Sequence, residues 1–273
     1  MSNWTIILIV AFFTFMINLT ETLAYSMRYA GLKSKQIAIS MSFVTSTLLV
    51  SRLSNMFQAP LLGKMVDDTI RIGSPAALAH LEFTFRMVLV GGFLGVLAAA
   101  LLTPTMVKTF ELSIHSFLRI GSLPRMAGML LFSPRRWGKL LACLTRPRLS
   151  MLKDISLKRI PKNFLILNGI VASIYSIGVL ASLLAGAFLP DMRATAIQLS
   201  GIVNGMATIL FTLMVDPTGA RITDQAVHGV RPAADVKSVV VYLMASRMIG
   251  LLVIAQIILT PAANYIMAIT KLI

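Results

Sequence analysis

The chain has 273 residues, of which 57% are hydrophobic and only 13% are charged. This composition leaves too little polar surface to cover a soluble domain of that size, so it excludes an ordinary soluble protein and indicates a membrane protein. The formal net charge is +15, and twelve of the cations lie between residues 107 and 162, against Glu111 and Asp154.

Runs of about 20 apolar residues predict an all-α fold with six transmembrane helices. We expect the spans at residues 3–25, 36–59, 84–103, 164–189, 194–215 and 237–270, in a single membrane domain that covers residues 1–273. The first run is too long and too polar at its far end for a cleavable signal peptide, and it lacks a small-residue cleavage site. We therefore expect it to be retained as a helix.

The polar residues of the first span recur at a spacing of three and four, so they lie on one face of the helix. They are Asn18, Glu21, Tyr25 and Arg28. A carboxylate inside a membrane marks either a functional site or an ion pair with a neighbouring group. The sequence leaves both interpretations of Glu21 open.

The second span holds Arg52, with no acidic residue nearby in the sequence. A guanidinium keeps its proton and costs at least about 2.5–3.5 kcal/mol at a bilayer centre, so Arg52 should face a counter-charge, a protein interior or a water-filled cavity. Hydroxyls and amides form a face beside it: Thr47, Ser51, Ser54, Asn55 and Gln58. Such groups can simply join helices, but together with an arginine they favour a wet interior. Pro60 is expected to bend or end this helix.

The third span carries Gly91, Gly92 and Gly95, which allow close approach of another helix, and Pro104 is expected to close it. Residues 105–162 then form a basic amphipathic segment that prolines divide into short pieces. We expect short helices in the headgroup layer of the cytoplasmic leaflet, bound to anionic membrane lipids at about 1 kcal/mol per cation. Nucleic acid is a poor alternative partner, because spans on both sides hold the segment and it has no known binding motif.

The last two spans repeat features of the first two. A shift of 195 residues places Glu21 on Asp216, and the same shift places Arg52 on Arg247. Few other positions match, so a parallel repeat of spans one and two with spans five and six is only weakly supported. Asp216 precedes a proline, and we expect it at a helix end near the water boundary. Gln198 begins another polar face in the fifth span.

The distribution of cations predicts the topology. With the basic segment in the cytoplasm, the connectors after spans one, three and five are cytoplasmic and both termini lie outside.

There is no Walker P-loop and no GxGxxG, HExxH or GxSxG motif, and one Cys and three His give no metal-ligand spacing. The sequence thus predicts no cofactor and no metal, and a transporter rather than an enzyme. Guanidinium groups bind phosphate with paired hydrogen bonds, which favours an anionic or amphiphilic substrate.

Two long runs carry a family resemblance, NLTETLAYSMRYAG and SFVTSTLLVSRLSNMFQAPLLGKMVDD. They resemble the bacterial Amj family, the "alternate to MurJ" lipid II flippases, and the resemblance extends over essentially the whole chain. It implies a multi-pass protein of the bacterial plasma membrane. Such a protein moves the undecaprenyl-pyrophosphate-linked peptidoglycan precursor from the inner to the outer leaflet, in support of cell-wall synthesis and cell shape.

Together these arguments predict a substrate site. We expect Arg52 and Arg247 to line a central cavity and bind the pyrophosphate, with Glu21 balancing their charge when the site is empty. Arg28, at the cytoplasmic mouth, would recruit the headgroup or only fix the topology. The amides expected to bind sugar or peptide groups are Asn55, Gln58 and Gln198.

Two other functions stay open. An exporter of another anionic or amphiphilic molecule would show substrate-dependent efflux without an effect on wall synthesis. A membrane scaffold for wall-synthesis enzymes would hold both arginines in internal ion pairs and would have no cavity open to either leaflet. Six spans are few for an enclosed pathway, which makes a homodimer plausible.

Overall fold

The computed structural model describes residues 3–273, and within this range it contains helices and no strand. Six helical stretches are long and apolar enough to cross a membrane: Trp4–Ser34, Ile37–Ile72, Pro75–Ile120, Lys162–Phe188, Pro190–Val227 and Ala233–Thr270. The predicted all-α fold with six spans is therefore confirmed.

Four of the spans are single helices, namely α1 (Asn3–Ser34), α2 (Ile37–Ile72), α3 (Pro75–Ile120) and α6 (Lys162–Phe188). The fifth consists of η2 (Pro190–Met192), α7 (Arg193–Gln198), α8 (Ser200–Leu210), the π-helical turn η3 (Phe211–Val215) and α9 (Asp216–Val227). The sixth consists of α10 (Ala233–Ile249), the π-helical turn η4 (Gly250–Ile254) and α11 (Ala255–Thr270). Between α3 and α6 lie α4 (Leu123–Leu131), α5 (Pro134–Ala142) and η1 (Leu149–Leu152).

Two helices run through prolines that were expected to bend or end them. The helix α2 contains Pro60 and continues to Ile72, and α3 contains Pro104 and continues to Ile120. The prediction that Pro104 closes the third span is therefore wrong. Proline removes one backbone hydrogen bond, but in membrane helices neighbouring groups can satisfy the freed carbonyl, so the helix need not stop.

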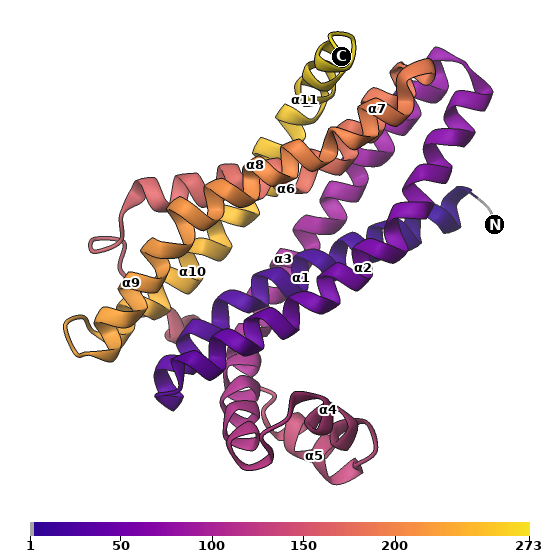
Figure 1. The fold of residues 1–273 in the computed structure, drawn as a ribbon. Coiled ribbons are helices and arrows are strands. Elements are labelled where there is room, and N and C mark those ends of the chain that lie inside the picture. The colour runs from indigo at the N-terminus through magenta and orange to yellow at the C-terminus, as the bar shows by residue number, and fades with distance from the viewer. Residues whose placement is uncertain (1–2) are drawn as a thin grey trace.

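The helices form one elongated bundle with two distinct ends (Figure 1). Both termini, the turn between α2 and α3, and α7 lie at one end, which we call the terminal end. The turns after α1 and α9 and the far part of α3 lie at the opposite end, which we call the basic end, and α4 and α5 are attached there. Successive connectors therefore lie at alternate ends of the bundle, as expected for a chain that crosses it six times.

Close helix contact is made on the glycines of α3. A side-chain carbon at Gly91 would lie 3.1 Å from the carbonyl oxygen of Ala11 in α1, and one at Gly95 would collide with the carbonyl oxygen of Phe15. Only glycine lets the two backbones come this near. The predicted close-approach surface of the third span is thus the α1–α3 contact.

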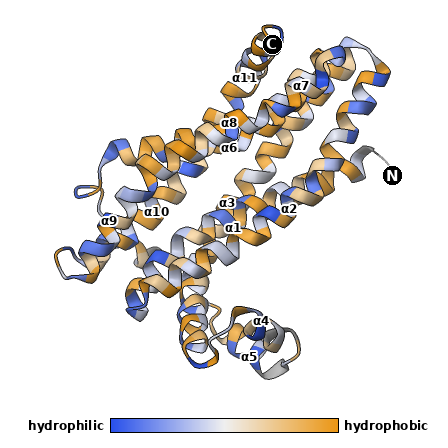
Figure 2. Ribbon diagram, in the orientation of Figure 1, coloured by the Kyte–Doolittle hydropathy of each residue, from blue (hydrophilic) through white to orange (hydrophobic). Residues whose placement is uncertain are grey.

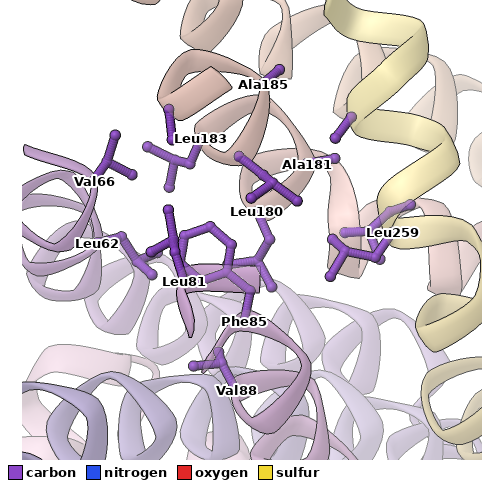
Figure 3. Close-up of a cluster of buried hydrophobic side chains, with 14 of the residues drawn as sticks. Leu62, Val66, Leu81, Phe85, Val88, Leu180, Ala181, Leu183, Ala185 and Leu259 are labelled. Carbon is purple, nitrogen blue, oxygen red and sulfur yellow. The ribbon is translucent and has the colours of Figure 1, made fainter. Parts of the chain in front are cut away.

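A large apolar cluster fills the terminal end of the bundle (Figure 3). Its central residues are Leu62 and Val66 of α2, Leu81, Phe85 and Val88 of α3, Leu180 and Leu183 of α6, and Leu259 of α11. Four spans contribute fully or nearly fully buried side chains to this cluster, so this end is closely packed.

Hydrophobic residues predominate along the spans, and many of the hydrophilic residues lie toward the helix ends (Figure 2). Leu49 and Phe57 of α2 and Ile209 and Leu213 of α8 are examples of large exposed apolar side chains. A surface of this kind suits a hydrocarbon environment.

The basic segment of residues 105–162 differs from its prediction in two respects. Its first part, up to Ile120, belongs to α3. Its later parts are tied to the bundle, because the Thr105 hydroxyl donates to the carbonyl of Thr145 (3.1 Å) and accepts from its N–H (3.0 Å). The N–H of Ser156 donates to the hydroxyl of Ser238 in α10 (3.1 Å). The segment is therefore fastened to two spans.

Candidate functional site

Two connected chambers lie inside the bundle. The larger has a volume of about 480 Å³ and the smaller about 100 Å³. Both are lined by Glu21, Ser51, Arg52, Tyr175 and Arg247. The larger volume lies within the usual range for small-molecule sites.

The chambers occupy different depths along the bundle. The small chamber reaches Leu62 and Leu180, which also belong to the apolar cluster at the terminal end. The large chamber extends the other way, to Arg28, Met41 and Asp216. The apolar cluster thus closes the cavity toward the terminal end, and the large chamber lies toward the basic end.

The floor and the walls of the large chamber come from different helices. The floor is polar and is built by α1, α6 and α10, through Glu21, Tyr25, Asn168 and Arg247. The walls are largely apolar and are built by α2, through Met41, Val44, Thr45 and Leu48, and by α8 and η3, through Ala207, Thr208 and Phe211. We call this arrangement the groove.

A buried ion pair crosses the floor. The Arg247 guanidinium of α10 lies 2.5 Å from the Glu21 carboxylate of α1 and donates to the Asn18 side-chain oxygen at 3.0 Å. The hydroxyl of Ser51 donates to the other Glu21 oxygen at 2.7 Å. The exposed fractions of the Arg247 and Glu21 side chains are only 8% and 12%. Removing one partner of such a desolvated pair leaves an uncompensated charge.

Arg52 has a different environment from Arg247. It lines both chambers and is exposed, and among the described residues it makes no hydrogen bond or ion pair. Asn55, one turn further along α2, is also exposed and lines the small chamber. The structure therefore places a free guanidinium at the junction of the chambers, beside one that already has a counter-charge.

Arg28 is bound at the basic end of the groove. Its buried guanidinium forms an ion pair with Asp216 of α9. Gly219, one turn after Asp216, makes room for it, since a side-chain carbon there would lie 2.8 Å from a terminal nitrogen of Arg28. Asp216 lies where η3 passes into α9 without a break. The expectation that it sits at a helix end was wrong.

The two ion pairs of the groove link the halves of the chain crosswise. Glu21 of span one binds Arg247 of span six, and Asp216 of span five binds Arg28 of span one. Glu21 and Asp216, the two acids related by the 195-residue shift, are thus both in ion pairs. Each binds an arginine from the other half of the chain. Arg52 and Arg247, which the same shift relates, differ in their environment, because only Arg247 of the two has an acidic partner among the described residues.

The two glutamines expected in the site are placed differently. The Gln58 side chain is buried, lines the small chamber and donates to the hydroxyl of Thr14 at 2.6 Å. Gln198 is the last residue of α7, is exposed, and lines neither chamber. The structure does not bring Gln198 to the cavity.

The residues that α6 contributes to the lining of the two chambers were not predicted from the sequence. Tyr175 lines both chambers, and Asn168 lies two turns before it on the same face. The Tyr25 hydroxyl donates to the Asn168 side-chain oxygen (3.1 Å), and the Asn168 amide donates to the hydroxyl of Ser246 (2.8 Å). The spacing of seven residues between Asn168 and Tyr175, which places both side chains on one face of a largely apolar helix, was the available signal.

The chemistry of the groove suits the binding of an anionic or sugar-like group. It offers guanidinium, hydroxyl, amide and phenol groups, which can hold such a group by hydrogen bonds. Among the described residues there is no group of three or more His, Cys, Asp or Glu that could hold a metal ion.

Comparison with known proteins identifies relatives along nearly the whole chain. The profile of the family described as "Amj: Alternate to MurJ" matches residues 13–270. The chain is 33% identical over 267 residues to the "Lipid II flippase Amj" of Bacillus subtilis (strain 168), a match that covers 98% of this chain and 97% of the relative. No solved structure matches the chain.

Proposed function

This chain belongs to the Amj family, and from that premise we propose that it is a lipid II flippase, which moves the lipid-linked peptidoglycan precursor from the cytoplasmic to the outer leaflet. The headgroup would enter the groove, and its pyrophosphate would bind the floor. The protein would act as a transporter and would support cell-wall synthesis.

Arg52 carries this proposal. A cation that lines a cavity without a protein partner is costly in a membrane unless something else balances it. A pyrophosphate supplies that balance, and a guanidinium can bind its oxygens with two parallel hydrogen bonds. Neighbouring Asn55 could bind the same headgroup, since it lines the cavity on the same helix face.

Arg247 and Glu21 would have a conditional role. In the empty groove the two balance each other at 2.5 Å. A pyrophosphate that reaches Arg247 must compete with Glu21, whose second oxygen is still held by Ser51. Glu21 thereby sets how much binding free energy an anion must supply before it can replace the internal pair.

The orientation follows from the positive-inside rule. With the basic segment in the cytoplasm, the large chamber faces the leaflet where the precursor is made, and the apolar cluster separates it from the outside. The α4–α5 region supports this orientation, because exposed Phe132, Trp137 and Leu141 alternate there with Arg136 and Lys139. Such a surface would bind the anionic cytoplasmic leaflet.

Two observations favour transport over a scaffold role. A scaffold requires both arginines to be held in internal ion pairs, whereas Arg52 has none among the described residues. A scaffold also needs no internal space, whereas the large chamber measures about 480 Å³.

The test is leaflet translocation in proteoliposomes, with fluorescent lipid II as the probe and undecaprenyl phosphate as the comparison lipid. We expect lipid II transport by the wild type and at least a tenfold loss in Arg52→Ala. Arg71→Ala is the matched control, because Arg71 is exposed on the same helix, lines neither chamber and pairs only with Asp68 (3.8 Å). We expect this control to transport within twofold of the wild type.

Either of two results would reject the proposal. The first is undiminished lipid II transport by Arg52→Ala. The second is efflux of a small anion by the wild type together with no transport of lipid II, which would instead indicate an exporter.

A further inference from the structure

The two walls of the groove make at most slight contact with each other. The helix α2 packs against α1, α3 and α6, whereas α8 packs against α6, α7 and η3. Between them, next to the large chamber, the facing residues are Val44, Thr45 and Leu48 on α2 and Thr208 and Phe211 on the other wall. We call this opening the lateral slot.

The lateral slot and the floor have opposite chemistry. The facing wall residues are apolar or carry a single hydroxyl, and Thr208 uses its hydroxyl within its own helix, on the carbonyl of Asn204 (2.8 Å). The floor behind them holds charged groups. Arg247 there is buried and has a side-chain nitrogen, Nε, with no hydrogen-bond partner among the described residues. An occupant that satisfies both parts must be an amphiphile.

The outer rims of the lateral slot are also apolar. Exposed apolar side chains lie next to the wall residues on both sides of the lateral slot. They are Leu49 and Leu53 of α2, Ile209 of α8 and Leu213 of η3. Arg52 is also exposed and lies on α2 between Leu49 and Leu53. An apolar chain that enters nearer the basic end, beside Val44 and Leu48, would pass no charged side chain of either wall. The headgroup alone would have to leave water.

We propose that the lateral slot between α2 and α8–η3 seats the hydrocarbon chain of a single-chain prenyl phosphate while its headgroup lies on the floor. This inference rests on the proposed function and deepens it, because it assigns the route of the lipid tail. The chain stays in contact with the membrane throughout the transfer, so the protein needs to enclose only the headgroup.

The structure provides a matched pair of variants. Thr208 and Thr212 are both exposed threonines on the same helical stretch, four residues apart, but only Thr208 lines the groove. Thr208→Phe would fill the lateral slot, and Thr212→Phe would place the same ring outside it. Neither side chain has a hydrogen bond to another helix among the described residues, so both variants are expected to fold.

The first measurement separates tail from headgroup. In proteoliposomes we expect Thr208→Phe to reduce the transport of lipid II at least tenfold and Thr212→Phe to stay within twofold of the wild type. Binding of a tail-free, water-soluble pyrophosphate analogue of the headgroup should stay within twofold in both variants. Equal transport by the two variants, or loss of headgroup binding in Thr208→Phe, would overturn the assignment of the lateral slot.

The second measurement does not depend on transport. Undecaprenyl phosphate with a photoreactive group in its chain would be crosslinked to the purified wild type and to both variants, and the labelled peptides mapped. We expect most label on residues 41–48 and 207–211, and at least a fivefold reduction there in Thr208→Phe. Label spread evenly over the exposed spans would contradict the proposal. Label at the slot in a protein that fails to move lipid II would reject the proposed function alone.

Discussion

The terminal end of the bundle and the groove are built by largely the same helices, yet one is closed and the other open. At the terminal end, Leu62 and Val66 of α2 pack against buried apolar side chains of α3 and α6 (Figure 3). In the groove, the residues that face the space between helices include Glu21, Arg52 and Arg247. Apolar groups can be packed dry, but a charged group without a partner in the described part of the chain, here Arg52, is costly to bury against apolar neighbours.

The two regions also differ in what ties α2 to the second half of the chain. At the terminal end an ion pair joins Asp67 of α2 to Arg193 of α7. In the groove the ion pairs start from α1, at Glu21 and Arg28, and no ion pair among the described residues joins the groove wall of α2 to α8. The terminal end is therefore both packed and latched by an ion pair, whereas the walls of the groove are joined by none among the described residues.

The largest expected effect comes from breaking the floor. Arg247→Met should lower the free energy of unfolding by about 3–5 kcal/mol, because it leaves Glu21 buried without a counter-charge. The double variant Glu21→Gln, Arg247→Met should recover most of that loss yet fail to transport lipid II. Unfolding in detergent and the transport assay would measure the two quantities. Equal stability of the single and double variants would mean that the pair is not desolvated.

The next effect concerns the closed end. Phe85 is fully buried in the apolar cluster, so Phe85→Ala should reduce the free energy of unfolding by about 3–5 kcal/mol. Phe83, two residues before it, is 59% exposed, and Phe83→Ala should change stability by less than about 0.5 kcal/mol. Headgroup binding per folded molecule should be unchanged in both. A similar loss in the two variants would contradict the packing described for the terminal end.

A smaller effect is expected where the two regions meet. Gln58 of α2 donates to Thr14 of α1 at 2.6 Å, at the side of the small chamber. Gln58→Leu should lower stability by about 0.6–2 kcal/mol, the usual size of an interhelical hydrogen bond in a membrane. A double-mutant cycle with Thr14→Val would isolate the pair, and a coupling free energy of zero would show that it does not contribute.

The smallest effect is expected from the latch. Asp67 and Arg193 are partly exposed, so their pair should contribute only about 0.2–1 kcal/mol. Asp67→Asn should therefore raise the rate at which a cysteine introduced at Leu62 is alkylated by about 1.4–5-fold. Asp68→Asn is the control, because Asp68 pairs only with Lys64 and Arg71 of its own helix. If both variants had the same alkylation rate, the latch would not hold the terminal end closed.

The fold could be predicted further than the site. Hydropathy and length predicted the number of spans, because these properties belong to each segment alone. Helix continuation through Pro60 and Pro104 could not be predicted, because it depends on what surrounds the freed carbonyls.

For the site, helical periodicity placed Glu21 and Arg28 on one face, but their partners lie 226 and 188 residues away in sequence. Only the assembled bundle decides which acid meets which arginine. Gln198 was misplaced for a different reason. It lies six residues, or about 9 Å of helix, before Asn204, the first residue of this span that lines a chamber, so it falls toward the terminal end beyond the cavity.

The uninterrupted course of α3 through Pro104 makes its far part a support for the basic end. Residues 105–120 extend about 24 Å beyond the proline, and Val107, Phe110 and Ile114 of this part form a buried cluster with Met27 of α1 and Phe43 of α2. Cys143, the sole cysteine of the protein, follows α5 and lies two residues before Thr145, which is hydrogen-bonded to Thr105 where that support begins. A spin label or fluorophore on this natural thiol would therefore measure how far the α4–α5 region moves relative to the bundle, without any engineered residue.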